Sequence, residues 1–85
     1  MHVLKIDKSI TDDVATDPTC TVLTRAIIAM GHALGLKIIA EGIEDAAQAR
    51  TLVGLGCDAG QGYWLGHPVP GVPWLQPHVT ASLAR

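Results

Sequence analysis

Three polar residues in this sequence follow or interrupt short apolar runs, where chemistry is common in α/β proteins. They are Lys5, Glu41 and Gln61. A lysine supplies a localised cation, a carboxylate can bind a hard metal ion or activate water, and an amide can fix a water molecule or a phosphate oxygen. By residue type alone, Lys5 and Glu41 also fit ordinary charges at strand ends, and Gln61 fits a loop residue that forms hydrogen bonds. The functional and the structural interpretation both stay open here.

The apolar runs around these residues predict three strands separated by two helices. We expect strands at about 2–7, 37–41 and 59–65, and helices at about 18–34 and 46–55. A carboxyl-terminal helix over about 73–84 is less well defined, because Pro77 cannot lie inside a helix without breaking it. Alternating apolar strands and amphipathic helices predict parallel βαβ units with right-handed crossovers. The carboxyl edge of such a sheet is where ligands bind, and it would gather the three polar residues.

Capping residues mark the expected helices. Asp17 followed by Pro18 is typical of a helix start, and Gly35 is the expected left-handed terminator. Between them, residues at helical spacing predict one apolar face: Leu23, Ile27, Met30 and Leu34, widened by Ala26 and Ala33. Asp45 and Gln48 resemble a capping box for the second helix, whose inward residues are expected to be Ala49, Leu52 and Val53.

The composition limits the class of protein. Eighty-five residues allow at most one small domain, whose independent stability would be marginal. Hydrophobic residues make up 48% and charged residues 16%, which excludes a disordered polar tail. A net charge of −2 and 4% aromatic residues argue against a nucleic acid polymer as partner.

Neither a membrane segment nor a secretion signal is predicted. The amino terminus meets Lys5 before an apolar signal-peptide core could form, and the longest apolar region is shorter than the roughly 20 residues that span a bilayer. Cys20 and Cys57 stand far apart in the sequence and are expected to be reduced core thiols. The chain is therefore predicted to be cytoplasmic.

Four ordered strings resemble the closing motifs of the EAL domain. They are L-K-I-D at 4–7, A-E-G-I-E at 40–44, L-G-C-D at 55–58 and Q-G-Y at 61–63. Their separations also match that family, and the resemblance extends from Val3 to about Pro70. EAL domains are modified (β/α)8 barrels of the TIM type that hydrolyse cyclic di-GMP to linear pGpG with Mg²⁺ or Mn²⁺. The resemblance implies an α/β chain that forms the last three βα units of an incomplete barrel.

The resemblance also implies roles for individual residues. Lys5 would lie beside the nucleophilic water and the metal site. Glu41 would be a metal-site carboxylate, and Gln61 would orient water or substrate. Glu44, the second Glu of the E-G-x-E string, would hold the active-site loop, and Asp7 is placed with it as substrate or loop support.

The chain also departs from the family. A (β/α)8 barrel needs about 250 residues, and the E-x-L, Asn, Glu and D-D-F-G elements that carry the other metal ligands are missing. We therefore expect no catalysis, and no stably bound metal, from these 85 residues alone. Two alternatives stay open: a non-catalytic module that pairs its sheet edge with a copy of itself or with the missing EAL half, and a receptor that binds cyclic di-GMP without cleaving it.

Overall fold

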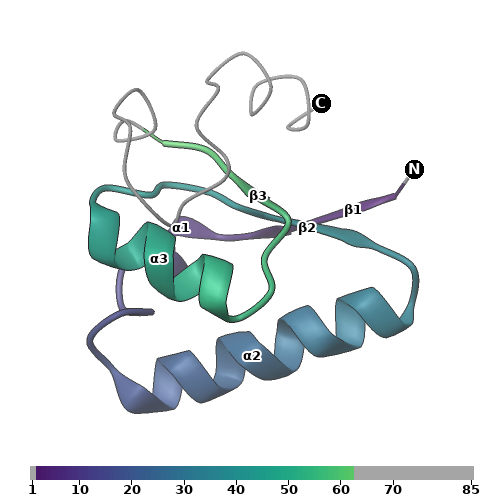
Figure 1. Cartoon of the computed structure of the whole chain (residues 1–85), viewed down its shortest axis with the longest axis horizontal. Helices are drawn as coiled ribbons and strands as arrows, with labels where there is room; N and C mark the ends of the chain where they lie inside the picture. The colour runs from purple at the N-terminus through teal and green to yellow at the C-terminus, as the bar shows by residue number, and fades with distance from the viewer. Residues whose placement is uncertain (1, 63–85) are drawn as a thin grey trace.

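The computed structural model describes residues 2–62 (Figure 1). Its elements are β1 (Val3–Ile6), α1 (Lys8–Thr11), α2 (Pro18–Ala33), β2 (Lys37–Ala40), α3 (Ala46–Gly54) and β3 (Ala59–Gly60). The expected strand residues 63–65 and the expected helix over 73–84 lie outside the described residues. Within residues 2–62, no helix combines the length and the apolar character needed to cross a membrane.

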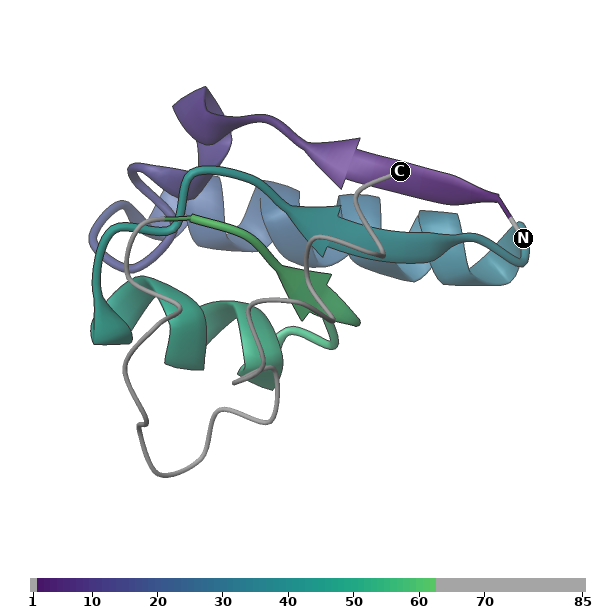
Figure 2. The ribbon, with the colours of Figure 1, turned by 90° about the horizontal axis from the view of Figure 1, so that it is seen from above.

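The three strands form one parallel sheet in the order β1-β2-β3. Figure 1 shows α2 beneath the strands, and Figure 2, which looks down on the sheet, shows α2 behind the strands and α3 on the β3 side. Each helix is the crossover between two parallel neighbours, as predicted from the alternation of apolar runs and helical patterns. The described part of the chain is therefore a two-layer α/β unit with parallel strands.

The starts of both long helices follow from their capping residues. Asp17 accepts the N–H of Thr19 at 3.0 Å, and Pro18 opens α2. Asp45 accepts the N–H of Gln48 at 2.8 Å at the start of α3. These side chains satisfy N–H groups that have no partner inside the helix. The predicted starts are confirmed.

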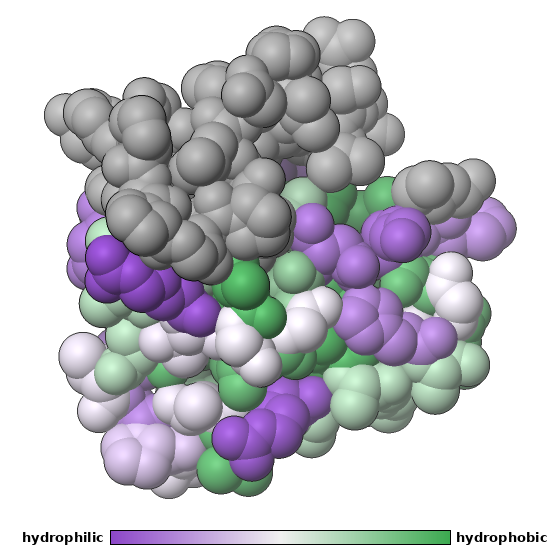
Figure 3. Space-filling model, in the orientation of Figure 1, coloured by the Kyte–Doolittle hydropathy of each residue, from purple (hydrophilic) through white to green (hydrophobic). Residues whose placement is uncertain are grey.

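The buried face of α2 differs from the face that the apolar spacing predicted. Thr24, Ile28 and Gly31 face the sheet and are buried. Most of the predicted stripe is exposed instead, with Met30 at 60% and Leu34 at 72%. Figure 3 shows green, apolar patches along the lower margin of the molecule, where α2 lies, interrupted by white and purple side chains. The predicted apolar face is present on α2, but the sheet covers a different face of the helix.

Two properties explain how this other face can be the buried one. The hydroxyl of Thr24 donates to the carbonyl of Cys20 at 2.7 Å, so the side chain can be buried without an unsatisfied donor. Gly31 has no side chain, and a Cβ at this position would lie 2.5 Å from Cδ1 of Ile38. Both residues are weak signals in an apolar pattern, yet they allow the helix backbone to approach the strands closely.

Both cysteines in the sequence are free thiols, as predicted. Cys57 is buried in the core beside Ile38 and Leu52, whereas Cys20 is half-buried at the edge of the same cluster. Burial raises the pKa of the Cys57 thiol to about 11, and hydrogen bonding with the backbone of Ala59 and Ala40 offsets only part of that effect. Cys57 is therefore an inert packing residue at neutral pH.

Candidate functional site

The structure places Lys5, Glu41 and Gln61 on one face of the sheet. In the register, Lys5 lies beside Ile39, and Ile39 lies beside Ala59. Glu41 is two residues after Ile39, and Gln61 is two residues after Ala59. Alternate residues of a strand share a face. The three polar residues predicted from the sequence therefore project in the same direction near the carboxyl ends of neighbouring strands.

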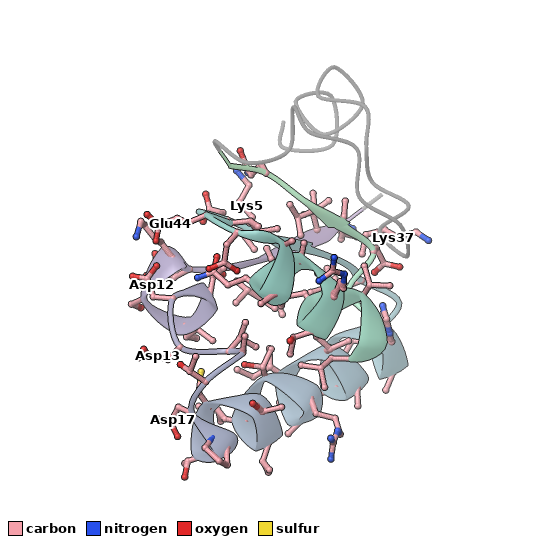
Figure 4. The ribbon with its side chains drawn as sticks, turned by 60° about the vertical axis from the view of Figure 1, so that its left-hand side comes forward. Lys5, Asp12, Asp13, Asp17, Lys37 and Glu44 are labelled. Carbon is pink, nitrogen blue, oxygen red and sulfur yellow. The ribbon has the colours of Figure 1, made fainter. Side chains whose placement is uncertain are left out.

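This face is opposite the helix layer. Leu4 and Ile38 alternate with the polar residues, and their side chains are the nearest ones to Gly31 of α2. Figure 4 shows Lys5 on the side of the sheet away from α2 and α3. Lys5 is exposed, and Glu41 and Gln61 are half-buried. A ligand that approaches this face can reach a cation, a carboxylate and an amide.

Backbone hydrogen bonds continue past the strand ends and hold this edge in place. The N–H of Glu41 donates to the carbonyl of Ile6 at 2.9 Å, and the N–H of Gln61 donates to the carbonyl of Ala40 at 2.9 Å. The carbonyl of Gln61 accepts the N–H of Ile43 at 3.1 Å. Because these bonds hold the main chain at Glu41 and Gln61, the two side chains start from defined positions.

Asp7 caps α1. Its carboxylate accepts the backbone N–H of Ser9 at 2.9 Å and the hydroxyl of Ser9 at 2.7 Å. These bonds, above all the one from the hydroxyl, lower the pKa of the Asp7 carboxyl. The sequence analysis did not predict α1 and ran the first strand through Asp7. The strand ends at Ile6 instead, because Asp7 caps the helical turn of α1 that follows.

Lys8 is the residue of this edge that sequence reasoning missed. Its Nζ lies 2.8 Å from a carboxylate oxygen of Asp12 and 3.4 Å from one of Glu44, which joins α1 to the loop after β2. Figure 4 shows Asp12 and Glu44 together at the α1 side of the molecule. The hydrogen bond to Asp12 is the main reason why the pKa of Lys8 is raised. No local motif signals a pair 36 positions apart.

The stem of Lys8 also packs against the backbone of Gly42, the residue after Glu41. Gly42 has φ +71°, and a Cβ there would lie 2.5 Å from Cγ of Lys8. Gln48 holds the other end of this loop, since its Oε1 accepts the N–H of Glu44 at 2.6 Å. The loop that begins with Glu41 is therefore fixed by a positive-φ glycine, a lysine stem and a buried amide.

The described residues do not make a complete metal site. Glu41 and Gln61 offer oxygen donors on the polar face, and a hard divalent ion needs about six oxygen ligands. Within residues 2–62, no group of three or more His, Cys, Asp or Glu side chains is arranged to hold an ion. A divalent ion at this edge would need further ligands from elsewhere.

Known proteins are similar to this chain in sequence and in fold. The sequence model of the EAL domain matches residues 1–68. The chain belongs to the EAL domain family. The signaling protein YkoW of Bacillus subtilis is 53% identical over 70 residues, which are 82% of this chain and 9% of YkoW.

Two solved EAL structures superpose on the chain. The PaMucR phosphodiesterase in complex with c-di-GMP matches with a TM-score of 0.71 and 43% identity, over 81% of this chain and 28% of that one. The EAL domain of Mycobacterium smegmatis DcpA matches with a TM-score of 0.71 and 34% identity, over 99% and 35% respectively. The three parallel strands thus align with part of an EAL barrel, and this chain spans about a tenth of the length of the curated relatives it matches.

Proposed function

We propose that this chain forms the carboxyl-terminal part, the last three βα units, of an EAL-type phosphodiesterase that hydrolyses cyclic di-GMP to pGpG. The observation that carries the proposal is the shared face of Lys5, Glu41 and Gln61 at the carboxyl edge of a parallel sheet. The similar PaMucR phosphodiesterase was solved with c-di-GMP bound, which supports the nucleotide as the ligand. Free thiols at Cys20 and Cys57 agree with action in the cytoplasm.

Each residue of the shared face has a proposed task. The ammonium of Lys5 attracts the phosphodiester and stabilises negative charge that develops on the attacked phosphoryl oxygens. The carboxylate of Glu41 orients attacking water or binds a cation shared with other carboxylates. The amide of Gln61 holds a water molecule or a phosphate oxygen by hydrogen bonding.

The loop after Glu41 positions that carboxylate. Glu44 is tied to Lys8, and Gly42 lies against the lysine stem. We assign Glu44 to loop support and not to contact with the reacting atoms. Asp7 supports the same edge through the cap of α1.

Mg²⁺ or Mn²⁺ is the proposed ion of the complete domain. Because the described residues supply too few ligands for it, we expect the 85-residue chain alone to show no hydrolysis. Activity then requires the missing ligands from the remainder of an EAL barrel.

A chimera tests this function. The matched segment of the PaMucR phosphodiesterase is replaced by residues 1–68 of this chain, and formation of pGpG from cyclic di-GMP is followed by chromatography with Mn²⁺ present. We expect hydrolysis within about tenfold of the parent enzyme. Glu41→Gln and Lys5→Met in the chimera should each lower kcat by about 100-fold or more.

The matched control is Asp13→Asn, which removes an exposed carboxylate from a connection outside the shared face. It should leave hydrolysis unchanged. A folded chimera without activity, or full activity in the Glu41→Gln variant, would contradict the proposal. Binding of cyclic di-GMP by such an inactive chimera would favour the alternative of a non-catalytic receptor.

A further inference from the structure

The pairing beside Glu41 contains one residue more on the β2 side than on the β3 side. The N–H of Gln61 donates to the carbonyl of Ala40, and the carbonyl of Gln61 accepts the N–H of Ile43. In a regular parallel ladder, a residue bonds to the two positions that flank its partner, so the second donor would be Gly42. Glu41 and Gly42 therefore both lie opposite Gln61. This arrangement is a β-bulge, which we call the Glu41–Gly42 bulge.

The backbone of Gly42 suits this insertion. Its φ is +71°, in the left-handed region that one class of bulge requires and that glycine adopts without steric cost. The pairing with β1 stays regular up to Glu41, whose N–H still donates to the carbonyl of Ile6 at 2.9 Å. The extra residue thus displaces the chain only after the position that carries Glu41.

The displaced chain rests on Gly62. A Cβ at position 62 would overlap the carbonyl oxygen of Ile43, and it would lie 2.6 Å from the nitrogen and 3.0 Å from the carbonyl carbon of the same residue. All three atoms belong to the main chain, so no side-chain rotation can make room for it. Figure 2 shows the green end of the described chain beside the segment that leads from β2 to α3. The close approach of the two backbones therefore requires glycine at position 62.

The loop after β2 is held against movement away from position 62. The Lys8 stem lies against Gly42, and the Gln48 amide accepts the N–H of Glu44 at 2.6 Å. Gln61, in contrast, is the immediate chain neighbour of residue 62. An added side chain at position 62 would therefore push the end of β3 away from the loop and carry Gln61 with it.

Resting on the proposed function, we propose that Gly62 is a positioning residue of the site. Its contact with the chain that leaves the Glu41–Gly42 bulge sets the distance between the Gln61 amide and the Glu41 carboxylate. Bulges beside active sites re-aim a side chain, and a displacement of about 1 Å within a site can lower a rate by about 100-fold. Gly62 has no side chain that could touch the reacting atoms, so its effect passes through the main chain of Gln61.

Glycine-to-alanine variants of the chimera described above test this role. Gly62→Ala should lower kcat for cyclic di-GMP by about 30-fold or more, while KM changes by less than about threefold because Lys5 keeps its place on β1. Gly54→Ala is the matched control, since no atom lies within 4 Å of a Cβ at that position of α3. The control should leave kcat and KM unchanged.

A double-mutant cycle separates positioning from a general loss of structure. In the Gln61→Ala background no amide is left to displace, so adding Gly62→Ala should lower kcat by less than about threefold. Each variant is assayed well below its own Tm. An unchanged kcat in Gly62→Ala would overturn the proposal. An equal loss of kcat with and without the Gln61 amide would also overturn it.

Amide hydrogen exchange gives a readout that does not depend on hydrolysis. In the unsubstituted chimera, the bond to Gln61 should protect the N–H of Ile43. In Gly62→Ala this N–H should exchange at least about tenfold faster, while the N–H of Glu41 keeps its protection. Rapid exchange at Ile43 in the unsubstituted chimera would overturn the proposal, even if Gly62→Ala failed to fold. A chimera that is inactive but shows the expected exchange pattern would contradict the proposed function alone.

Discussion

The imidazole of His32, at the end of α2, lies 2.7 Å from a carboxylate oxygen of Asp58, just before β3. The same oxygen accepts the backbone N–H of Ile38 at 2.8 Å. One carboxylate thus joins a helix, the neighbouring strand and the connection that leads to the third strand. Because β3 carries the main chain on to Gln61, this junction also supports the edge that bears the proposed site.

The first prediction concerns stability in acid. Burial raises the pKa of Asp58, but the hydrogen bonds from His32 and the Ile38 N–H outweigh it, so the pKa is lowered on folding. A lowered pKa adds stability above the unfolded pKa of about 3.9, and this stability is lost as the pH falls through the folded value. Asp58→Asn should cost about 1 kcal/mol at pH 7, a modest effect because the pair is partly exposed, and this cost should shrink as the pH falls below the unfolded pKa.

Urea unfolding of both chains between pH 2.5 and 7 measures this difference. Asp13→Asn, at an exposed position, serves as control and should follow the natural chain at each pH. If the difference in the free energy of unfolding between the natural chain and Asp58→Asn were constant with pH, the carboxylate would not be the source of the stability.

The second prediction tests which face of α2 is buried. Ile28 is 1% exposed and Met30 is 60% exposed. Ile28→Ala should destabilise the chain by about 3 kcal/mol through lost contacts and a cavity, and Ile28→Val by about 1 kcal/mol. Met30→Ala should stay within about 0.5 kcal/mol of the natural chain. Denaturant titration ranks the stabilities of the three variants. A larger loss of stability for Met30→Ala than for Ile28→Ala would mean that the face of α2 with Met30 is the buried one.

The third prediction concerns the loop after Glu41. Gly42→Ala should cost about 2 kcal/mol or more, because it combines a positive φ with a clash against the Lys8 stem. Gly35→Ala is the matched control, since Gly35 has φ +78° but no atom within 4 Å of a Cβ, and it should cost only about 1 kcal/mol. Thermal melts compare the two. Adding Lys8→Gly should recover part of the Gly42→Ala loss, and no recovery would mean that the lysine stem does not restrict this loop.

The fourth prediction concerns the thiols. With a pKa of about 11, Cys57 has a thiolate fraction of about one in a thousand at pH 8, and its burial also excludes reagents. Iodoacetamide at pH 8 should therefore modify Cys20 first, as read by mass spectrometry. Cys20→Ser should leave the native chain almost unlabelled, and full labelling should return in denaturant. Rapid labelling of Cys57 in the native chain would show that this part of the core opens readily.

Sequence reasoning predicted the parallel α/β order because its signals are local. The caps Asp17 and Asp45, the terminator Gly35 and the apolar runs each act within a few residues. The shared placement of the candidate residues was predictable for a related reason. Residues at the ends of parallel strands meet at one edge, so Lys5 and Glu41 could be brought together before any coordinates were known.

What sequence reasoning missed depends on contacts between distant segments. The partners of Lys8 include Glu44, which lies 36 positions away. The burial of Thr24 depends on a hydroxyl that finds its acceptor inside the helix. The apolar stripe of α2 was predicted, but periodicity reports that a face is apolar without reporting which neighbour covers it.

The close approach at Gly31 has a mechanical consequence. The hydrogen that stands in place of a side chain there sets how far α2 lies from the strands, with Cδ1 of Ile38 filling the space a Cβ would need. That separation also sets how Ile28 of α2 packs in the core with Ile38 of β2. The spacing of the helix layer and the sheet therefore depends on a residue that contributes no side chain of its own.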